Sequence, residues 1–365
     1  MIIGIDGHML GDHSGGNESY YRNILREMVV SSDDIVYLFV RDTIEADEYK
    51  DKFRVIRFRS KSAFLRNFYE LDLLCKKYQV EVLHTQYFIP FIRHCKVVCT
   101  IHDICFEHYK DIFIKKEYLR QKILIPYAAK HSDYIFTVSE YSKNDIVKQY
   151  RIKPEKVIVT YNAVNQRFHT LDKNDLNEEE LRGKFGIGKA KYILTVGNLQ
   201  PRKNIPRLIE AFNLWNKQNN HDVKLVIVGK KAWLYSDVIK AVNKKPESIV
   251  LTDYVSDEDL IRLYNGAECF IYPSFFEGFG IPPLEAMACG IPVAVANTTS
   301  LPEVVGNAGL YFDPFMISSI ADAIDRLMNY KDRNEMIKKG FKQVGKFHWN
   351  DSAGLIVDTY HRTVR

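Results

Sequence analysis

The stretch FFEGFGIPPLEAMACGIPV (residues 275–293) decides the fold class of this 365-residue chain. One apolar run, FIYPS (270–274), precedes it, and another, IPVAVAN (291–297), overlaps its end. Between the two runs stand a tight EGFG turn and a predicted helix with prolines in its first turn and Gly290 as its C-terminal stop. A strand, a turn, a helix and a second strand predict a βαβ unit, in which the two strands are parallel.

The same alternation extends over most of the chain. Short apolar runs predict strands, and amphipathic stretches near 18–29, 64–78, 115–130 and 140–150 predict helices between them. Continuous apolar strands that alternate with helices indicate parallel sheets covered on both faces. The predicted strands are IIGID (2–6), DIVYLFV (34–40), EVLHT (81–85), KVVCTI (96–101), DYIFTVS (133–139), KVIVTYN (156–162), KYILTVGN (191–198), DVKLVIVG (222–229), SIVLTD (248–253), ECFIYPS (268–274), IPVAVAN (291–297) and GLYFD (309–313).

A polar, strand-poor segment interrupts this pattern at residues 163–191, and it is typical of a connection that carries a short helix. The length of the chain also suits two cores better than one. We therefore expect two doubly wound domains, residues 1–170 and residues 171–346. The amphipathic segment 347–365 either completes the second domain or returns to the first.

The composition is that of an ordinary globular protein, with 46% hydrophobic and 27% charged residues. A net charge of +5 is too small and too dispersed to predict nucleic-acid binding. No apolar run is long enough to span a bilayer, and Asp6, His8 and Asp12 interrupt the apolar core that a secretory signal would need. These features predict a cytoplasmic protein.

Basic and aromatic residues interleave in RVIRFRSKSAFLRNF (54–68). This pattern fits a solvated strand edge and helix face, and it also fits a surface that meets an anionic membrane or a phosphorylated acceptor. In the second case the protein would lie peripherally on the inner face of the plasma membrane.

The chain has six cysteines, which in a cytoplasmic protein are expected to be free thiols. Three of them lie with three histidines in one short segment, at positions 94, 95, 99, 102, 105 and 108. The spacing differs from that of paired zinc ligands, and a buried strand at 96–101 would point Cys99 and His102 to opposite faces. We expect no metal site there.

The turn in the opening stretch raises a question of charge, because a glycine-rich turn before a helix usually binds an anion whereas this one carries Glu277 and Glu285. Carboxylates repel phosphate, but they accept hydrogen bonds from hydroxyl groups. Adjacent cations, Arg202 and Lys203, follow another predicted strand and precede a helix, which predicts a diphosphate site. A diphosphate with a polyol at each end is a nucleotide sugar.

Two further positions follow predicted strands of the first domain. Gly15 and Gly16 stand before a helix and would allow a ligand to approach the backbone, although their spacing is not that of a dinucleotide-binding motif. His102 ends its strand beside Asp103 and is a candidate for hydrogen bonding or proton handling.

The block PSFFEGFGIPPLEAMACGIPVAVANTTSLPEVVGNAGLYFDP (273–314) resembles the signature of family 4 of the retaining, nucleotide-sugar-dependent glycosyltransferases. The glycine loop, His102-Asp103, TVSEYSKNDI (137–146) and VGNLQPRKN (196–204) extend the resemblance over most of the chain. It implies a GT-B fold, in which two Rossmann-like domains with doubly wound parallel sheets face each other across a cleft. It also implies that segment 347–365 crosses back to the first domain.

The resemblance also implies roles for individual residues. Arg202 and Lys203 would hold the donor diphosphate, Glu277 and His102 would bind the donor sugar, and Glu285 would bind the ribose. The remaining donor contacts implied by the family pattern are Gly15, Gly16, Asn198, Gly278, Phe279, Gly280 and Ile281.

The family mechanism is same-face attack by an acceptor hydroxyl, with charge on the leaving group neutralised by cations and helix N–H groups. The mechanism implied by the resemblance uses these cations and helix N–H groups in place of a metal, so we expect neither a metal nor another cofactor. The resemblance to mannosyltransferases of bacterial polysaccharide assembly favours GDP-mannose as donor and a glycan or lipid-linked acceptor. A non-hydrolysing UDP-sugar epimerase and a catalytically silent sugar-nucleotide-binding protein are the alternatives.

Overall fold

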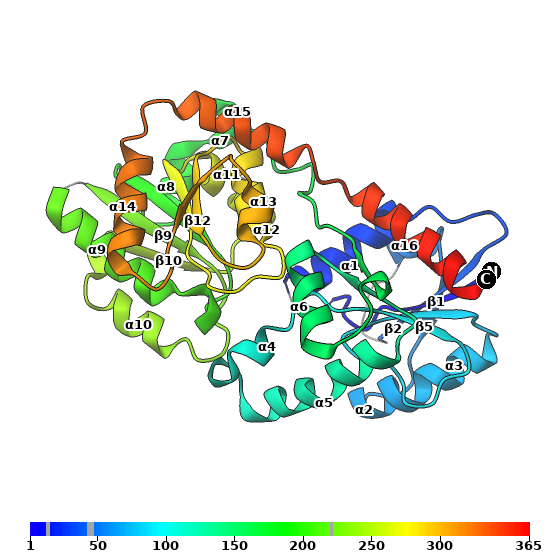
Figure 1. Ribbon diagram of the computed structural model, residues 1–365. Coiled ribbons are helices and arrows are strands. Elements are labelled where there is room, and N and C mark those ends of the chain that lie inside the picture. Colours follow the sequence, from blue (N-terminus) through cyan, green and yellow to red (C-terminus); the bar gives the residue numbers. More distant parts are fainter. Residues whose placement is uncertain (12–14, 42–46, 220–221) are drawn as a thin grey trace. The chain divides into compact units, whose positions relative to one another are not determined.

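The computed structural model describes residues 1–11, 15–41, 47–219 and 222–365. These residues form two compact units, each with its own core (Figure 1). The first unit contains residues 1–162 and 348–365, and the second contains residues 163–347.

In the described part of the first unit, seven parallel strands form one sheet in the order β3-β2-β1-β4-β5-β6-β7. The direction of the strand order reverses beside β1, so a switch point lies between β1 and β4, where open sheets of this kind bind ligands at their carboxyl ends. The strands are β1 (Ile2–Asp6), β2 (Ile35–Val40), β3 (Arg54–Arg57), β4 (Val82–Gln86), β5 (Lys96–Thr100), β6 (Tyr134–Thr137) and β7 (Val157–Val159).

Helices pack on both faces of this sheet, which is why the central strands β4 and β5 are buried almost along their whole length. The longest, α5, contributes Ile125, Ala128 and Ala129 to the core. The helices are α1 (Gly16–Glu27), α2 (Ala63–Leu65), the π-helical turn η2 (Arg66–Glu70), α3 (Leu71–Lys77), α4 (Cys105–His108), α5 (Lys115–His131), α6 (Glu140–Tyr150) and α16 (Trp349–Val364), with short 3₁₀ turns η1 (Asp47–Tyr49), η3 (Lys110–Ile112) and η4 (Pro154–Lys156).

The C-terminal helix α16 belongs to the first unit and runs beside α1 (Figure 1). Tyr360 is fully buried, and its hydroxyl shares a 2.6 Å hydrogen bond with Nδ1 of His84 in β4. The Ser352 hydroxyl donates to the carbonyl oxygen of Tyr161 at 2.7 Å. The last 18 residues are therefore part of the unit that contains the N-terminus, and one face of α16 is buried in it.

In the described part of the second unit, six parallel strands form a sheet in the order β10-β9-β8-β11-β12-β13. Here the switch point lies between β8 and β11, which pair directly. The strands are β8 (Lys191–Val196), β9 (Val223–Val228), β10 (Ile249–Asp253), β11 (Cys269–Tyr272), β12 (Val293–Ala296) and β13 (Leu310–Phe312).

Helices also cover the second sheet. The indole of Trp215 on α9 donates to Asp325 on α14 at 3.1 Å, which ties these two neighbouring helices together. The helices are α7 (Lys173–Leu176), α8 (Glu178–Lys184), α9 (Ile205–Asn219), α10 (Ser236–Val242), α11 (Asp257–Asn265), α12 (Ile281–Ala288), α13 (Leu301–Val305), α14 (Ile317–Met328) and α15 (Arg333–Val344), with 3₁₀ turns η5 (Pro201–Lys203) and η6 (Pro246–Ser248).

The predicted fold class, two doubly wound parallel α/β sheets, is confirmed, and each predicted strand is present within a few residues of its expected bounds. The helix expected at 64–78 is instead divided into α2, η2 and α3. The connection holds two short helices, α7 and α8, where one was expected.

The two units divide eight residues before the boundary expected at residue 170. The segment after Asn162 already packs on the second unit: the Phe168 ring lies edge-on to Tyr264 at 5.9 Å, and the Leu171 amide donates to Asn265 at 2.7 Å. A polar composition marked this segment as a connection but gave no sign of these two contacts.

None of the helices in the described part of the chain combines the length and the apolar character needed to cross a membrane.

Candidate active site

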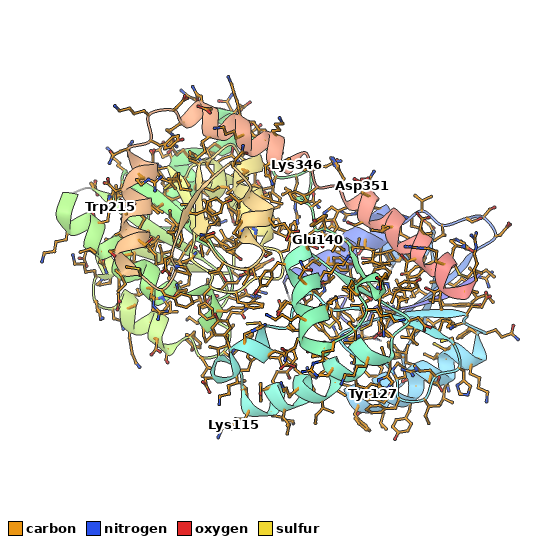
Figure 2. All side chains as sticks on the ribbon, viewed as in Figure 1. Lys115, Tyr127, Glu140, Trp215, Lys346 and Asp351 are labelled. Carbon is orange, nitrogen blue, oxygen red and sulfur yellow. The ribbon has the colours of Figure 1, made fainter. Side chains whose placement is uncertain are left out.

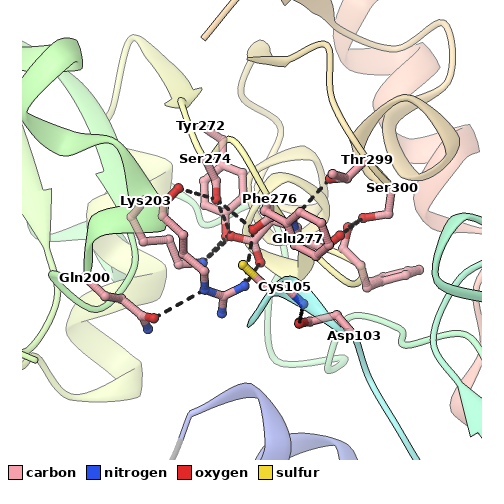
Figure 3. Close-up of polar contacts among 12 residues, drawn as sticks. Asp103, Cys105, Gln200, Lys203, Tyr272, Ser274, Phe276, Glu277, Thr299 and Ser300 are labelled. Atoms are coloured by element: carbon pink, nitrogen blue, oxygen red, sulfur yellow. Dashed lines mark hydrogen bonds and ion pairs between the residues drawn. The ribbon is translucent and has the colours of Figure 1, made fainter. Parts of the chain in front are cut away.

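Two loops meet at the switch point of the second sheet. One follows β8 and contains the 3₁₀ turn η5, and the other follows β11 and leads into α12. Because β8 and β11 are parallel neighbours, their carboxyl ends place Arg202 and Lys203 of the first loop beside Glu277 of the second (Figure 3). The sheet topology thus brings together residues that are 74 and 75 positions apart in the chain.

The two loops are fixed to each other by their backbones. The carbonyl oxygen of Arg202 accepts a hydrogen bond from the Phe275 amide at 3.0 Å and lies 3.0 Å from the Ser274 hydroxyl. Asn204 ends η5 in the left-handed conformation, with φ of 57°, and is buried. Its side-chain amide donates to the carbonyl oxygens of Pro273 at 3.1 Å and Pro314 at 2.7 Å. These bonds satisfy buried carbonyls that would otherwise destabilise the loop.

Glu277 is the centre of the site and is only 5% exposed. Its Oε1 accepts hydrogen bonds from Lys203 Nζ at 2.5 Å, from the Tyr272 hydroxyl at 3.0 Å and from the Ser274 hydroxyl at 2.7 Å. Its Oε2 accepts one from Arg202 Nη1 at 3.1 Å (Figure 3). Two cations and one carboxylate therefore share a largely buried cluster with a net positive charge.

The cluster keeps Glu277 ionised. Burial by itself would raise the pKa of this carboxyl, but the charges of Arg202 and Lys203, together with hydrogen bonds from Lys203 and Ser274, lower the pKa to about 2. The Lys203 ammonium also donates to the Tyr272 hydroxyl at 2.6 Å. The burial of Tyr272 next to Glu277 raises the pKa of its phenol well above the usual value, so that the phenol remains a neutral donor.

The turn that carries Glu277 is held by a serine from the next loop. The Ser300 hydroxyl lies 3.0 Å from the Glu277 carbonyl oxygen and 2.9 Å from that of Phe279, while the Glu277 amide donates to the Thr299 hydroxyl at 3.1 Å. Gly280, with φ of 94°, precedes the first residue of α12. A Cβ there would lie 2.6 Å from Leu301, so the backbone conformation and the packing both require glycine.

Glu285 is part of α12 and has a different environment. Its Oε2 accepts a 2.9 Å hydrogen bond from the Tyr264 hydroxyl of α11. Burial raises the pKa of Glu285 to about 7, and the hydrogen bond from Tyr264 and the charge of Arg167 only partly oppose this effect. The structure thus joins Glu277 to the cations and gives Glu285 a separate partner.

The other predicted donor contacts of the second unit lie on the same two loops. Asn198 follows β8, Gly278 and Phe279 are buried in the turn, and Ile281 is the first residue of α12. The Phe279 ring packs edge-on against Phe347 at 5.4 Å, and its side chain is buried.

The remaining predicted site residues belong to the first unit. His102 follows β5, is 6% exposed, and its Nε2 lies 2.7 Å from the Gln86 side-chain nitrogen at the end of β4. Gly15 and Gly16 begin α1, and Tyr20, one turn later, packs edge-on against the His102 ring at 4.8 Å. Burial lowers the pKa of His102 to about 3, so the imidazole is neutral at physiological pH.

The histidines near the cysteines have separate partners. His94 contacts Asp72 at 2.8 Å, His108 contacts Asp145 at 2.8 Å, and Cys99 is buried within β5. Within the described residues, no group of three or more His, Cys, Asp or Glu side chains is arranged to hold a metal ion.

Sequence reasoning missed four residues that shape the site: Tyr272, Ser274, Thr299 and Ser300. A signal existed for the first two, because hydroxyl residues two positions apart at the end of a strand point to the same side of the sheet, next to the turn that follows. Nothing in the sequence linked Thr299 and Ser300 to a glutamate more than twenty positions earlier.

Comparison with known proteins identifies the family of the chain. Residues 14–168 match the family model described as Glycosyltransferase Family 4, and residues 177–343 match the model described as Glycosyl transferases group 1. The chain is 32% identical over 275 residues to O-antigen chain mannosyltransferase B of Escherichia coli, an alignment that covers 73% of this chain and 70% of the relative. It is 33% identical over 263 residues to O-antigen chain mannosyltransferase RfbU of Salmonella typhimurium, covering 69% of each.

Among solved structures, the chain is similar to Anabaena HepE, determined in complex with UDP and glucose. The TM-score is 0.76 at 18% sequence identity, and the alignment covers 99% of this chain and all of HepE. This likeness establishes the GT-B fold. The family models and the two relatives confirm the resemblance in the sequence, and the chain belongs to glycosyltransferase family 4, a family of the retaining GT-B type.

Proposed function

We propose that the protein is a retaining hexosyltransferase that moves mannose from GDP-mannose to a glycan or lipid-linked acceptor in cell-surface polysaccharide assembly. The observation that carries this proposal is the buried cluster of Arg202, Lys203 and Glu277 at the carboxyl ends of β8 and β11. A net positive cluster at a switch point fits an anionic ligand, and the carboxylate within it fits a ligand that also bears hydroxyl groups.

The donor diphosphate would interact with Arg202 and Lys203. Glu277 holds both cations in place before a ligand arrives, so their positions do not have to be organised during the reaction. As the bond between the sugar and the diphosphate breaks, negative charge develops on the leaving group. The two cations and the amides at the start of α12 would stabilise this charge, and no protein group has to form a covalent intermediate for same-face attack.

The hydroxyls of the donor would interact with the two glutamates. Oε1 of Glu277 accepts three hydrogen bonds and Oε2 accepts one, so Oε2 is the oxygen with capacity for a sugar hydroxyl. Glu285 would accept the ribose hydroxyls, and such bonds favour its ionised form. The proposal assigns His102 a hydrogen bond to the donor sugar as a neutral imidazole, because its pKa is about 3. Gly15, Gly16, Asn198 and the 278–281 backbone complete the donor contacts.

The choice of mannose rests on the two relatives at 32% and 33% identity, which are both O-antigen chain mannosyltransferases. Their role in O-antigen assembly also supports a glycan or lipid-linked acceptor. We place the reaction in the cytoplasm, at the inner face of the plasma membrane.

Replacement of Glu277 or Lys203 by alanine tests the site. Either substitution should lower the transfer rate at least about a hundredfold, because each removes charge from a preorganised cluster. Glu277→Gln is a second variant, to be used in case the loss of the buried carboxylate in Glu277→Ala unfolds the protein. It retains the size of the side chain and removes only its charge. The matched control is the surface pair of the same unit, Lys191 and Glu268, which lie 3.2 Å apart. Alanine at either control position should leave transfer unchanged, and near-normal turnover of a folded Lys203 variant would refute the assignment.

A thermal-shift panel of GDP-, UDP- and ADP-sugars tests the donor. GDP-mannose should give the largest rise in melting temperature. An epimeric sugar nucleotide formed from donor alone would favour the epimerase alternative. Donor binding without transfer to any acceptor, and without hydrolysis, would favour the silent binding protein.

A further inference from the structure

One side of the first unit exposes large apolar side chains instead of burying them. They come from the α2–α3 segment, from the loop before β5 and from the outward face of α5, and their exposed fractions run from 47% to 64%. We call them the apolar surface: Phe64, Leu65, Tyr69, Leu73, Phe91, Ile92, Leu119 and Ile123. Tyr127 marks the end of α5 that lies toward α2, and Lys115 marks the other end (Figure 2).

Ring contacts make this surface continuous. Phe64 packs against Phe68 with centroids 5.2 Å apart, and Phe68 stacks on Phe91 at 4.7 Å. Phe91 in turn packs edge-on against Tyr127 of α5 at 5.1 Å. Three segments that are separate in the sequence therefore form one apolar face. On an ordinary protein surface, exposed apolar residues are scattered singly.

The helix α5 shows the pattern most clearly. Its inward face buries Ile125, Ala128 and Ala129 in the core, as in any amphipathic helix. Its outward face carries Leu119 and Ile123, which are 60% and 58% exposed, where charged residues are expected. Core packing explains the apolar residues of the inward face. It does not explain Leu119 and Ile123, which remain exposed in the described chain.

The segments that carry this apolar surface are rich in basic residues. Segments 59–79, 91–93 and 114–127 contain ten Lys and Arg residues and three acidic residues, Glu70, Asp72 and Glu117. All three acids are engaged locally: Glu70 accepts the amides of Arg59 and Ser60, Asp72 pairs with His94, and Glu117 pairs with Arg120. The guanidinium of Arg93 lies 6.0 Å from the Tyr127 ring, and its buried Nη1 has no hydrogen-bond partner among the described residues.

We infer that this face binds the surface of an anionic lipid bilayer. Aromatic and aliphatic side chains enter the region between headgroups and acyl chains, while long basic side chains reach the lipid phosphates. The charge decides for a membrane over a second copy of the chain, because two copies of this face would bring like charges together.

The structure also redefines the sequence segment first associated with a membrane. Of residues 54–68, the strand β3 at 54–57 is not part of the apolar surface: Arg54 lies over Tyr37, and Arg57 donates to the carbonyl oxygen of Arg41. Phe64 and Leu65 belong to it, together with residues of α5 and of the loop before β5, which the sequence did not link to a membrane.

Flotation of the 365-residue chain with vesicles tests this inference. The assay contains neither donor nor acceptor, so its outcome is independent of the proposed transferase activity. Vesicles of phosphatidylglycerol and phosphatidylcholine in equal parts should carry the protein at low salt, and vesicles of phosphatidylcholine alone should carry much less. A Leu119→Ser, Ile123→Ser double variant should bind at least about tenfold more weakly. A Lys116→Gln, Arg120→Gln double variant should bind roughly thirtyfold more weakly, since each basic residue near an anionic surface favours binding by about 1 kcal/mol.

Matched controls come from the second unit. The apolar control pair is Leu234 and Tyr254, which are 55% and 65% exposed, close to the values for Leu119 and Ile123. The basic control pair is Lys338 and Lys342, which are exposed and four positions apart on α15, as Lys116 and Arg120 are on α5. Serine at the first pair or glutamine at the second should leave flotation unchanged.

Three results would overturn the inference. The first is absence of flotation with anionic vesicles at low salt, and the second is equal binding of wild type and all the variants. The third is concentration-dependent self-association that the Leu119 and Ile123 substitutions abolish, in a protein that does not bind to vesicles.

Discussion

Glu277 and Glu285 lie eight positions apart, and their pKa values are shifted in opposite directions. Two cations lower the pKa of Glu277 to about 2 against the effect of burial, whereas burial raises the pKa of Glu285 to about 7. At neutral pH, Glu277 is therefore a fixed charge, and Glu285 can gain or lose a proton. The two side chains are chemically identical, so their neighbours cause the difference in pKa.

The hydroxyl of Tyr272 connects the charged pair, since it accepts from Lys203 and donates to Glu277. A Tyr272→Phe substitution should lower the free energy of unfolding by about 1–3 kcal/mol, because it leaves a buried ammonium with one partner fewer. Urea denaturation measures this change. Tyr254→Phe is the control, because Tyr254 is 65% exposed. An equal loss in both variants would contradict the role given to Tyr272.

The raised pKa of Glu285 predicts how stability depends on pH. The folded protein retains the proton of this carboxyl up to about pH 7, whereas the unfolded chain releases it near pH 4.5. Over that interval the folded state binds more protons, so this group contributes stability below pH 4.5 that is lost as the pH rises to 7, by at most about 3 kcal/mol.

The Glu285→Gln variant should not show this loss. Urea titrations at several pH values between 4.5 and 7 should give a wild-type free energy of unfolding that falls relative to that of the variant. Glu277 makes the opposite contribution, which is present above pH 4.5 and lost toward pH 2. Parallel curves for wild type and Glu285→Gln would show that the pKa of Glu285 is normal.

At the scale of single elements, the turn before α12 depends on one glycine. Gly280→Ala should destabilise the second unit by about 2 kcal/mol or more, since it combines a positive φ with a 2.6 Å approach to Leu301. Gly354→Ala in α16 is the contrasting variant: outside the backbone of α16 itself, no described atom lies within 4 Å of the added methyl group, and the helix should gain about 1 kcal/mol. Thermal melting distinguishes them, and equal melting temperatures would contradict the packing.

The start of α1 offers the opposite case. Among the described residues, no atom outside the backbone of its own helix and its chain neighbours lies within 4 Å of the place that a Cβ of Gly16 would take, so this part of the fold does not require glycine there. Gly16→Ala should therefore keep or slightly raise the melting temperature. If the position is reserved for a ligand, the same variant should transfer sugar at least about tenfold more slowly, because a methyl group would displace the donor. Unchanged activity would remove Gly16 from the site.

At the scale of the whole molecule, the two units have separate cores, and the chain returns to the first unit only through α16. Tyr360, 357 positions after Ile3, is fully buried with it in the first core. Tyr360→Ala should cost about 3–5 kcal/mol, since it opens a cavity and removes the hydroxyl partner of His84.

Hydrogen exchange of the Tyr360→Ala variant locates that loss. Protection should fall in residues 1–162 and 348–365 and stay near wild type in residues 163–347, because no side chain of the second core is changed. An equal loss of protection in both sets of residues would show that the chain unfolds as one cooperative unit.

Much of this protein follows from its sequence. Apolar runs such as KVVCTI and IPVAVAN could be placed as strands because a strand buried on both faces needs continuous apolar residues. The cations and glutamates could be named because they follow strands, where ligands bind in parallel sheets. The π-helical turn at Arg66–Glu70 and the packing of Phe168 could not be foreseen, since both depend on contacts with distant residues.

By itself, the sequence determined the fold class, the family and the set of charged residues at the site, because local periodicity and short motifs encode these. Only the tertiary structure decided how those residues are used. It placed Glu277 beside Arg202, Lys203 and Tyr272, the last of which was not foreseen. It gave Glu285 a separate partner, and the pKa of Glu285 shifts in the direction opposite to that of Glu277. It also assembled three distant segments into one exposed apolar surface. Electrostatic and packing energies depend on distances through space, and strand order sets those distances, so spacing along the chain could not supply them.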